Sequence, residues 1–367
     1  MTRRALIIFA VAVLIAAIGI LSIYSTTYQK EGQLWQDIYK RQIIWAILGI
    51  AFFLIMYNFN YRRLLDATYL LYGLAILLLL IVFIAGTVRL GAQRWIRFAW
   101  FNFQPSEFVK IAIIIFLAGY FSNKSISDLY QPALRFRLFR GFILPLILVG
   151  VPVGLVIEQP DLGSALLILF IFIAIVYISG VRLVYLLSFL SLGILAMPVL
   201  WHLLRDYQKE RLMVFLNPNI DPLGAGYTII QSKIAIGSGG FFGKGWLAGT
   251  QGQLHFLPEA HTDFVFATFA EEWGFFGVSI LLFLYYLLIV QGINIALKTQ
   301  DSFGRILAMG ITLMLSIQVV INIAMVMGFA PVVGIPLPLM SYGGSSIFVT
   351  FISLGLLANI DRTRSVF

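Results

Sequence analysis

An aspartate stands where a long polar stretch of the chain meets an apolar one. Residues 203–263 are polar and rich in glycine, and Asp263 closes this stretch just before a new apolar run begins. A carboxylate at a boundary between water and lipid is costly to bury without a partner. It is also well placed to act on a substrate that is part lipid and part sugar or phosphate. Asp263 is therefore our first candidate for a catalytic residue, or alternatively for a ligand of a divalent metal ion.

A carboxylate and an ammonium group open the apolar segment that follows residue 105. Glu107 and Lys110 are three residues apart, so they lie on one face of a helix. One interpretation is a structural ion pair between helices, in which each partner needs the other. The other makes Lys110 a cation that faces a lipid head group, with Glu107 orienting it.

Three arginines lie in a short segment just before this pair. Arg89, Arg94 and Arg97 flank Trp95 in an amphipathic sequence. One interpretation is an interfacial helix with Trp95 and Trp100 at the depth of the lipid head groups. A second interpretation adds binding of an anionic phosphate by the guanidinium groups, with Arg94 as the leading candidate. The two interpretations are compatible.

The long polar stretch contributes two further cations. Arg211 lies near its start, and Lys244 lies in the glycine-rich segment 237–245. Glycine backbones can approach a phosphate closely, and a lysine supplies charge. The spacing is not that of a Walker A loop. Flexible packing over the mouth of a helix bundle is the alternative explanation of the glycines.

Two broken segments complete the set of candidates. Residues 158–161 (Glu-Gln-Pro-Asp) form a turn whose acids cap a helix, line a cavity or hold a metal. Several prolines and the run Ser341-Tyr-Gly-Gly-Ser-Ser346 precede the last apolar segment. Irregular backbone at membrane depth is tolerated where it lines a cavity. Ser341 is therefore a candidate for contact with the substrate.

The elements that position these residues are membrane helices. The chain has 367 residues, of which 60% are hydrophobic and 11% charged. This composition predicts an all-α, polytopic membrane protein that forms one integral-membrane domain over residues 1–367, with 203–263 as a large extracytoplasmic loop. The net charge of +9 fits basic loops on anionic lipid rather than nucleic acid. With no cysteine and three histidines, thiolate chemistry is excluded and a histidine metal cage is disfavoured.

Apolar runs predict about ten spans, with the large loop between the seventh and the eighth. Their approximate bounds are 5–24, 41–58, 65–88, 106–121, 141–157, 161–179, 183–202, 264–290, 304–328 and 341–360. Basic residues predict a cytoplasmic N-terminus and C-terminus and an outside location for the large loop. The residues counted as inside include Arg3, Arg62, Lys124, Arg135, Arg137, Lys298 and Arg362.

Taken together, these stretches resemble the SEDS family (shape, elongation, division and sporulation proteins). The matching runs occur in order along the whole chain and include 91–95, 104–110, 159–163, 217–227, 231–245, 249–251, 256–263, 270–276 and 338–345. The short N-terminus and residues 334–360 resemble the elongation branch, RodA, more than the division branch, FtsW.

The resemblance implies a ten-helix peptidoglycan glycosyltransferase of the bacterial cytoplasmic membrane, which joins lipid II units into glycan strands during elongation. It also implies that the family's essential acid falls on Asp263. A class B penicillin-binding protein, which cross-links peptides, is the implied partner, together with other proteins of the elongation complex. No organic cofactor is expected, whereas a divalent cation (magnesium or manganese) is a candidate.

The chemistry of the candidate residues agrees with this expectation. Extension of a glycan needs a base for the attacking hydroxyl and cations for the departing diphosphate of the undecaprenyl-linked strand. Asp263 is the candidate base, and Lys110, Arg94, Arg211 and Lys244 are the candidate cations. The alternatives are a flippase of lipid-linked precursor, which predicts charges through the full depth of the membrane, and a scaffold for partner proteins, which needs no Asp263.

Overall fold

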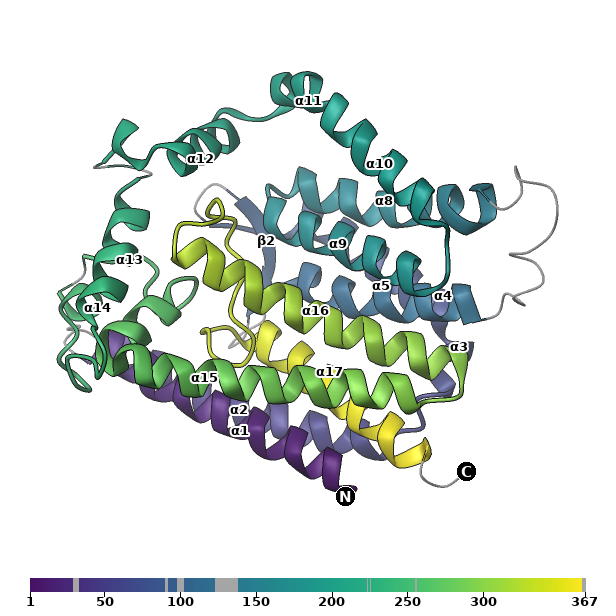
Figure 1. Cartoon of the computed structure of the whole chain (residues 1–367), viewed down its shortest axis with the longest axis horizontal. Helices are drawn as coiled ribbons and strands as arrows, with labels where there is room; N and C mark the ends of the chain where they lie inside the picture. Colours follow the sequence, from purple (N-terminus) through teal and green to yellow (C-terminus); the bar gives the residue numbers. More distant parts are fainter. Residues whose placement is uncertain are drawn as a thin grey trace.

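The computed structural model describes residues 1–28, 33–89, 92–97, 102–122, 138–222, 224, 226–254 and 256–364. Helices that run side by side make up most of it (Figure 1). Within these residues, seven helical segments are long and apolar enough to cross a membrane, and three shorter helices are also apolar. The protein is therefore an all-α, multi-pass membrane protein, as predicted. The count of ten spans stays a prediction.

The helices fall into three groups by length and composition. The long apolar segments are α1 (Arg3–Thr27), α2 (Gln33–Asn58), α5 (Pro105–Ser122), η1 with α8 (Phe139–Ile143 and Leu144–Glu158), α15 (Val265–Lys298), α16 (Ser302–Val326) and α17 (Gly344–Arg364). The shorter apolar helices are α4 (Thr68–Ala85), α9 (Leu162–Ile178) and α10 (Leu183–Leu195). The remaining short helices are α3 (Arg63–Asp66), α11 (Met197–Leu203), α12 (Asp206–Leu216), η2 (Pro218–Ile220), α13 (Tyr227–Ser238) and α14 (Thr250–Gln253).

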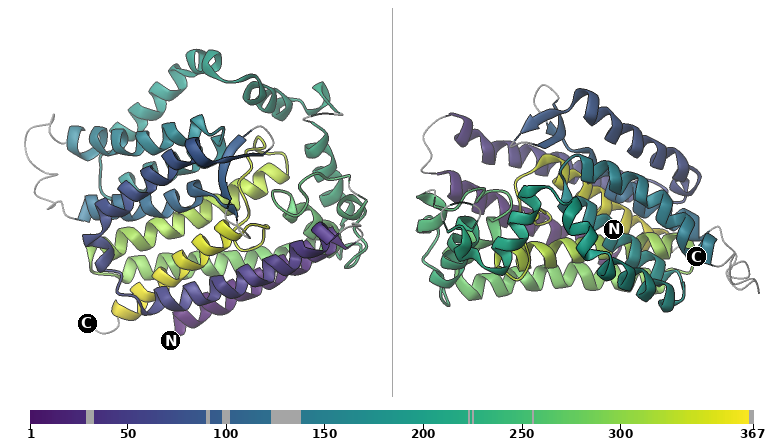
Figure 2. Two further views of the ribbon diagram at one scale, coloured as in Figure 1. Left: turned by 180° about the vertical axis from the view of Figure 1, so that it is seen from behind. Right: turned by 90° about the horizontal axis from the view of Figure 1, so that it is seen from above.

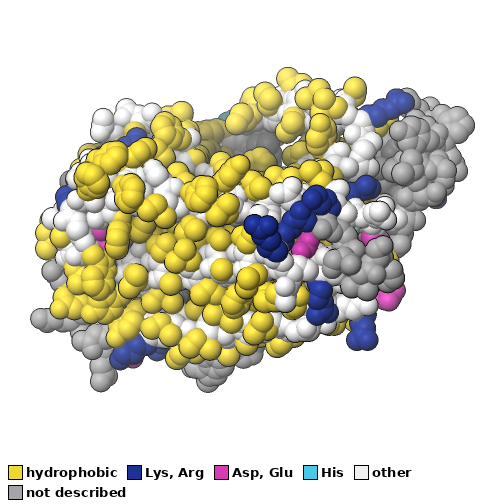
Figure 3. All heavy atoms as spheres, turned by 60° about the horizontal axis from the view of Figure 1, so that its bottom comes forward, with side chains coloured by type: hydrophobic (Ala, Val, Ile, Leu, Met, Phe, Trp, Pro, Cys, Tyr) yellow, Lys and Arg dark blue, Asp and Glu magenta, His cyan; other side chains and the backbone are white. Residues whose placement is uncertain are grey.

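The bundle has an inner and an outer layer. The apolar 18-residue stretches of α5 and α17 are 83% and 89% buried, so these two helices lie at the centre of the bundle. The corresponding stretch of α15 is 33% buried, so α15 lies in the outer layer. Apolar side chains cover much of the surface in Figure 3, as expected for contact with lipid. Hydroxyls inside the helices bond carbonyls one turn earlier, as Thr312 does with Ala308 (2.7 Å), which satisfies them without water.

Both termini lie at the same end of the bundle (Figure 1). The Thr2 hydroxyl donates a hydrogen bond to Asp361 (2.6 Å), and Arg4 forms an ion pair with the same carboxylate (3.5 Å). Termini on one side agree with an even number of crossings. Which side is cytoplasmic stays a prediction, and Lys124, Arg135 and Arg137, which support it, lie outside the described residues.

Residues 203–263 gather at the opposite end of the bundle (Figure 1). This stretch contains α12, η2, α13 and α14, so it is more ordered than a plain loop. Helices α10, α11 and α12 form an arch beside the packed helices, and both figures show it (Figures 1 and 2). Helices α5, α9, α15 and α17 all begin at this end, which we call the site end. The positive ends of four helix dipoles therefore face it.

The expected interfacial helix around Arg94 is wrong. Residues Thr87–Arg89 (β1), Ala92–Arg97 (β2) and Asn102–Phe103 (β3) form an antiparallel sheet in the order β1-β2-β3. Thr87 pairs with Trp95, and Ile96 pairs with Phe103. Successive side chains on a strand point to opposite faces, so an amphipathic segment of this length fits a strand as well as a helix. Trp100 lies outside the described residues.

Two of the expected spans also differ in detail. The segment 183–202 is divided into α10 and α11, with Ala196 between them. Helix α15 runs on to Lys298, and it is interrupted at Gly274, whose φ of 61° is left-handed. A side chain at that φ would be strained, so glycine is the residue suited to the break.

Candidate active site

Asp263 lies at the site end, one residue before Phe264, the N-cap of α15. Its side chain is partly buried. The side-chain amide of Asn322, on α16, donates a hydrogen bond to the backbone carbonyl of Asp263 (3.1 Å). The hydroxyl of Ser341 donates to the carbonyl of Thr262 (2.7 Å). The backbone is therefore held both at the catalytic candidate and at the residue before it.

The same two side chains also hold the irregular segment before α17. Asn322 donates its second amide hydrogen to the carbonyl of Ile335 (2.7 Å), and the Ser341 hydroxyl accepts from the backbone N–H of Leu337 (2.8 Å). Asn322 is 0% exposed and Ser341 2%. We call Asn322 and Ser341 the backbone clamp of Asp263. Since the Ser341 hydroxyl is occupied on both sides, the structure gives it a positioning role, and its contact with substrate stays a prediction.

Gly334 faces the carboxylate of Asp263. Its φ is +70°, a left-handed conformation that side chains rarely adopt. A Cβ at this position would lie 3.4 Å from Oδ2 of Asp263. The glycine therefore allows the turn and also leaves the space beside the carboxylate open.

The surroundings of Asp263 favour its protonated form. Burial, followed by the neighbouring charge of Glu259, raises the pKa of Asp263 from 3.8 to about 6, against the opposing effect of Arg211 and Arg94. The charge of Asp161 adds slightly to the increase. Two of the predicted cations are therefore close enough to act on the predicted base. A carboxylate with a pKa near 6 suits proton abstraction near neutral pH.

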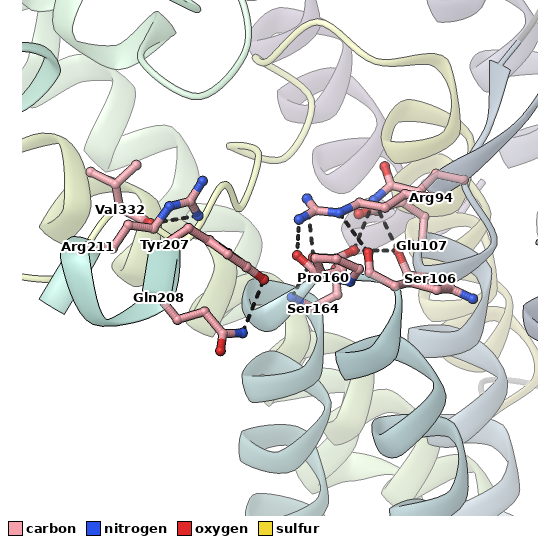
Figure 4. A network of polar contacts seen from close by, with 12 residues as sticks. Arg94, Ser106, Glu107, Pro160, Ser164, Tyr207, Gln208, Arg211 and Val332 are labelled. Atoms are coloured by element: carbon pink, nitrogen blue, oxygen red, sulfur yellow. Dashed lines mark hydrogen bonds and ion pairs between the residues drawn. The ribbon is translucent and has the colours of Figure 1, made fainter. Parts of the chain in front are cut away.

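Arg94 projects from β2 onto the turn between α8 and α9 (Figure 4). Its guanidinium donates to the backbone carbonyls of Gln159 (3.1 Å) and Pro160, and it lies 4.0 Å from Asp161. These contacts fix the guanidinium group while its charge still acts on Asp263. The β-sheet, which the sequence did not indicate, is therefore the element that positions Arg94.

Asp161 organises the beginnings of two helices. It is the N-cap of α9, accepting from the backbone N–H of Ser164 (3.2 Å), which confirms the capping interpretation of this turn. Its other oxygen accepts from Ser106, at the start of α5 (3.0 Å), and from Gln104 (3.3 Å). With both oxygens occupied, Asp161 supports the arrangement around Arg94.

Lys110 and Glu107 form an ion pair inside the bundle. Their charged atoms are 2.7 Å apart, and their side chains are 1% and 4% exposed. The predicted ion pair is therefore present, but it lies within α5 and not between helices, and it orients Lys110 through Glu107. Neither is among the charges that act on Asp263. Contact of Lys110 with the substrate stays a prediction.

Arg211 approaches Asp263 from α12, on the other side of the site from Arg94. Figure 4 shows the two guanidinium groups extending toward each other. Arg211 donates to the backbone carbonyl of Val332 (3.2 Å) and lies over the ring of Tyr207 (5.7 Å). Its side chain is exposed, so it remains available to an anion. Arg94 and Arg211 are the pair of cations that the structure brings together.

Lys244 lies elsewhere in the structure. Its ammonium group binds Glu271 of α15 (2.6 Å) and the hydroxyl of Thr250 (3.0 Å). It is not among the charges that act on Asp263. The glycines beside Lys244 bring its segment against α15 rather than against an anion, and its role with a diphosphate stays a prediction.

The glycine segment completes the hydrogen bonding of α15 at its break. The N–H groups of Lys244 and Gly245 donate to the carbonyls of Glu271 and Glu272 (both 3.0 Å). Phe275 and Phe276 donate in turn to the carbonyls of residues 240 and 241 (2.9 and 3.0 Å). The glycine segment therefore packs on the bundle, as the alternative interpretation predicted, but it is held there by backbone hydrogen bonds rather than loosely.

Few side chains that could act as metal ligands accompany Asp263 among the described residues. Among the described residues no three acidic, histidine or cysteine side chains are grouped so as to hold a metal ion. Magnesium binds through one or two carboxylates when phosphates supply the remaining ligands. The divalent cation therefore stays a prediction that depends on the diphosphate.

A family model described as a cell cycle protein, covering FtsW, RodA and SpoVE, matches residues 5–366. The chain belongs to the SEDS family. This SEDS protein is 41% identical over 353 residues to the peptidoglycan glycosyltransferase MrdB of Escherichia coli K12, which covers 94% of this chain and 90% of that protein. It is 38% identical over 367 residues to a probable peptidoglycan glycosyltransferase FtsW of Geobacter metallireducens, with 98% and 95% covered.

Solved structures support the same membership. The SEDS fold matches a chain from a peptidoglycan synthase complex, described as coordinating polymerization and crosslinking, with a TM-score of 0.81 and 34% identity over 97% of both chains. It matches the rod shape determining protein RodA of Thermus thermophilus with a TM-score of 0.70 and 30% identity, over 97% and 96% of the two chains.

Three features of this SEDS site were missed in the sequence. Asn322 carried a signal, because a polar side chain within an apolar span usually has a partner. Gly334 carried a weaker one, since it lies among prolines in irregular backbone. Glu259 is the neighbouring acid that most raises the pKa of Asp263, and its φ of +50° is unusual for a residue with a side chain.

Proposed function

We propose that this SEDS protein is a peptidoglycan glycosyltransferase that polymerises lipid II into glycan strands at the outer face of the bacterial cytoplasmic membrane, for elongation and maintenance of cell shape. The observation that carries the proposal is a partly buried carboxylate of raised pKa, Asp263, beside two guanidinium groups. The activities named for MrdB and FtsW support it. None of these relatives favours a flippase.

The reaction follows from the charges at the site. The 4-hydroxyl of the acceptor sugar attacks the anomeric carbon of the donor, and Asp263 takes the hydroxyl proton. The bond from this carbon to the lipid diphosphate breaks, and the diphosphate leaves with the electron pair. Arg94 and Arg211, with four helix N-termini at the site end, stabilise that anion. A single displacement inverts an α-linked donor to a β-linked product.

The remaining candidate residues act at a distance from the base. Lys110, oriented by Glu107, and Lys244 are cations for other parts of the lipid-linked substrates. Ser341 and Asn322 hold the base in position. Placing the base on fixed backbone matters because small displacements of a catalytic group are costly in rate.

A class B penicillin-binding protein is the proposed partner. A polymerase of glycan strands needs a transpeptidase to cross-link the peptides it displays. The resemblance to a chain of a complex that coordinates polymerization and crosslinking supports this pairing. Other proteins of the elongation complex are proposed on the family resemblance alone.

Polymerisation of lipid II by the purified protein tests the proposal. The wild type, supplied with its transpeptidase partner, is expected to produce long glycan strands on a gel. Asp263→Ala and Asp263→Asn are expected to lose about 10²–10⁴-fold in rate, the usual contribution of a general base. An Asp263→Ala protein that polymerises at the wild-type rate would overturn the assignment of the base. An inactive wild type that transports lipid II between leaflets would overturn the function.

A further inference from the structure

Two glutamates lie side by side in α15, and neither is among the charges that act on Asp263. Glu271 is 0% exposed and Glu272 is 4% exposed. Glu271 is well paired, because it accepts from the ammonium of Lys244 (2.6 Å), the backbone N–H of Thr250 (2.8 Å) and the hydroxyl of Thr250 (2.9 Å). Glu272 forms no ion pair with any of the described residues. Glu271 therefore has a lysine partner, and Glu272 has none among the described residues.

Only one of the two carboxylate oxygens of Glu272 has a hydrogen-bond partner among the described residues. One of its oxygens accepts from the hydroxyl of Ser25, on α1, and the backbone N–H of Leu247 also binds this carboxylate. The other oxygen, Oε2, is buried and meets no partner among the described residues. An ionised carboxylate in this place lacks a counter-charge. A protonated carboxyl with its O–H on Oε1 could donate to the Ser25 hydroxyl, but Oε2 would still have no donor.

Gly249 lies beside both carboxylates and presents no side chain to them. The position that a Cβ of Gly249 would take lies 3.2 Å from Oε2 of Glu271 and 3.4 Å from Oε1 of Glu272. The side-chain oxygen of Gln251 is also buried and has no partner among the residues described. The backbone N–H of Gln251 binds Glu271 (3.1 Å), so this residue belongs to the same cluster. The cluster thus holds spare oxygen acceptors and an excess of negative charge.

We propose that this cluster binds one monovalent hard cation, for which Na⁺ is the probe. Hard cations take oxygen ligands, and Glu272, Glu271 and Gln251 offer them. The two carboxylates and Lys244 leave one uncompensated negative charge, which a monovalent ion balances. No third acid, histidine or cysteine joins the cluster in the described residues, which argues against a transition metal.

The bound cation would join three parts of the chain. Ser25 lies on α1, Gly249 and Gln251 lie in and next to α14, and Glu272 lies on α15. The cation would therefore stabilise the packing of the glycine-rich segment 237–245 against the bundle. The inference uses Lys244 as the partner of Glu271 and does not require contact of Lys244 with a substrate.

Thermal unfolding of the purified protein in different salts tests the proposal. At equal ionic strength, NaCl is expected to raise the Tm of the wild type above its value in choline chloride by about 2–4 °C, the shift typical of a modest ligand. Glu272→Gln is expected to have the same Tm in both salts. Glu210→Gln, an exposed acid on α12, is the matched control and should keep the response.

A second variant guards against misfolding of Glu272→Gln. Gly249 has a φ of −70°, which alanine adopts freely, so Gly249→Ala fills the space while leaving both acids in place. It is expected to abolish the Na⁺ response and the binding of one ²²Na⁺ per chain. A wild-type Tm that is equal in Na⁺ and choline overturns the proposal, and so does a response that both variants keep. The proposal would also be overturned if the Tm did not depend on the cation but rose at lower pH, and if this rise were lost in Glu272→Gln. That result would indicate a bound proton instead of a cation.

Discussion

The side-chain amide of Asn322, near the C-terminal end of α16, donates a hydrogen bond to the backbone carbonyl of Asp263 at 3.1 Å. The amide is fully buried, and its second hydrogen is taken by Ile335. The predicted base is thus anchored to two parts of the chain that are distant in sequence.

Removal of this anchor should impair the reaction more than the fold. Asn322→Leu leaves two buried carbonyls without donors, which costs about 1–3 kcal/mol each when no water replaces the amide. We expect polymerisation to fall by about 10–100-fold, because the base is displaced. The measurement is the rate of glycan synthesis per folded protein, with the Tm of each variant determined in parallel. Gln318→Leu, an equally buried amide four residues earlier on α16, should retain activity.

The pH dependence of polymerisation should report the carboxyl of Asp263. Since the base works deprotonated and the pKa of Asp263 is about 6, the rate should rise tenfold per pH unit below 6 and level off above it. Glu259→Gln removes a neighbouring negative charge and should move the midpoint lower. Arg94→Met removes a positive one and should move it higher. Midpoints that stay in place in both variants would contradict the assignment.

The contribution of Asp263 to the free energy of unfolding should fall as pH rises, whereas the rate of polymerisation rises. The pKa of Asp263 in the folded protein, about 6, is above its ordinary value of 3.8, so the folded state holds the proton more tightly. The stabilisation from this proton is fully present below pH 4 and is lost as pH rises to 6. Asp263→Asn should therefore be relatively more stable than the wild type at pH 7 than at pH 4. Unfolding in detergent at both values measures this difference.

Gly334→Ala should reduce activity at little cost to insertion in the membrane. The new methyl group would lie 3.4 Å from the Asp263 carboxylate, and the φ of +70° would add about 1–2 kcal/mol of strain. Gly180→Ala provides the control, because Gly180 has a φ of +84° with open space where a Cβ would lie. Equal losses of polymerisation in both variants would show that strain, and not proximity to Asp263, is responsible.

The buried pair in α5 calls for a double variant. Lys110→Met alone leaves Glu107 uncompensated and should cost about 3–5 kcal/mol of stability. Lys110→Met with Glu107→Leu should recover most of that loss, since both charges are removed. If polymerisation stays low in the stable double variant, Lys110 acts on the substrate. If polymerisation returns with stability, the pair is structural only.

The membrane fold could be predicted because runs of apolar residues determine where helices lie, and they do so locally. The site depends on contacts between distant residues. Asp263 was recognisable from its place at the end of a polar stretch, but its bond to Asn322 spans 59 residues. The ion pair of Lys244 with Glu271 could not be predicted, because the two residues lie in different elements. The segment of Arg94 was misjudged because amphipathic character alone does not distinguish a short strand from a helix.

The polar stretch 203–263 contains two parts that are attached to the bundle in different ways, and one of them packs at the break in α15 at Gly274. Residues 240–245 exchange backbone hydrogen bonds with α15, so they cannot separate from it without exposing its amides. Helix α12 is held to its neighbours by side-chain contacts, such as that of Arg205 with Glu158 at 3.1 Å. Amides beside Gly274 should therefore exchange with solvent deuterium as slowly as those of the bundle, while α12 exchanges early. An epitope tag inserted near residue 204 would report on exposure of this face, whereas one inserted at residue 242 would disrupt the hydrogen bonds between this segment and α15.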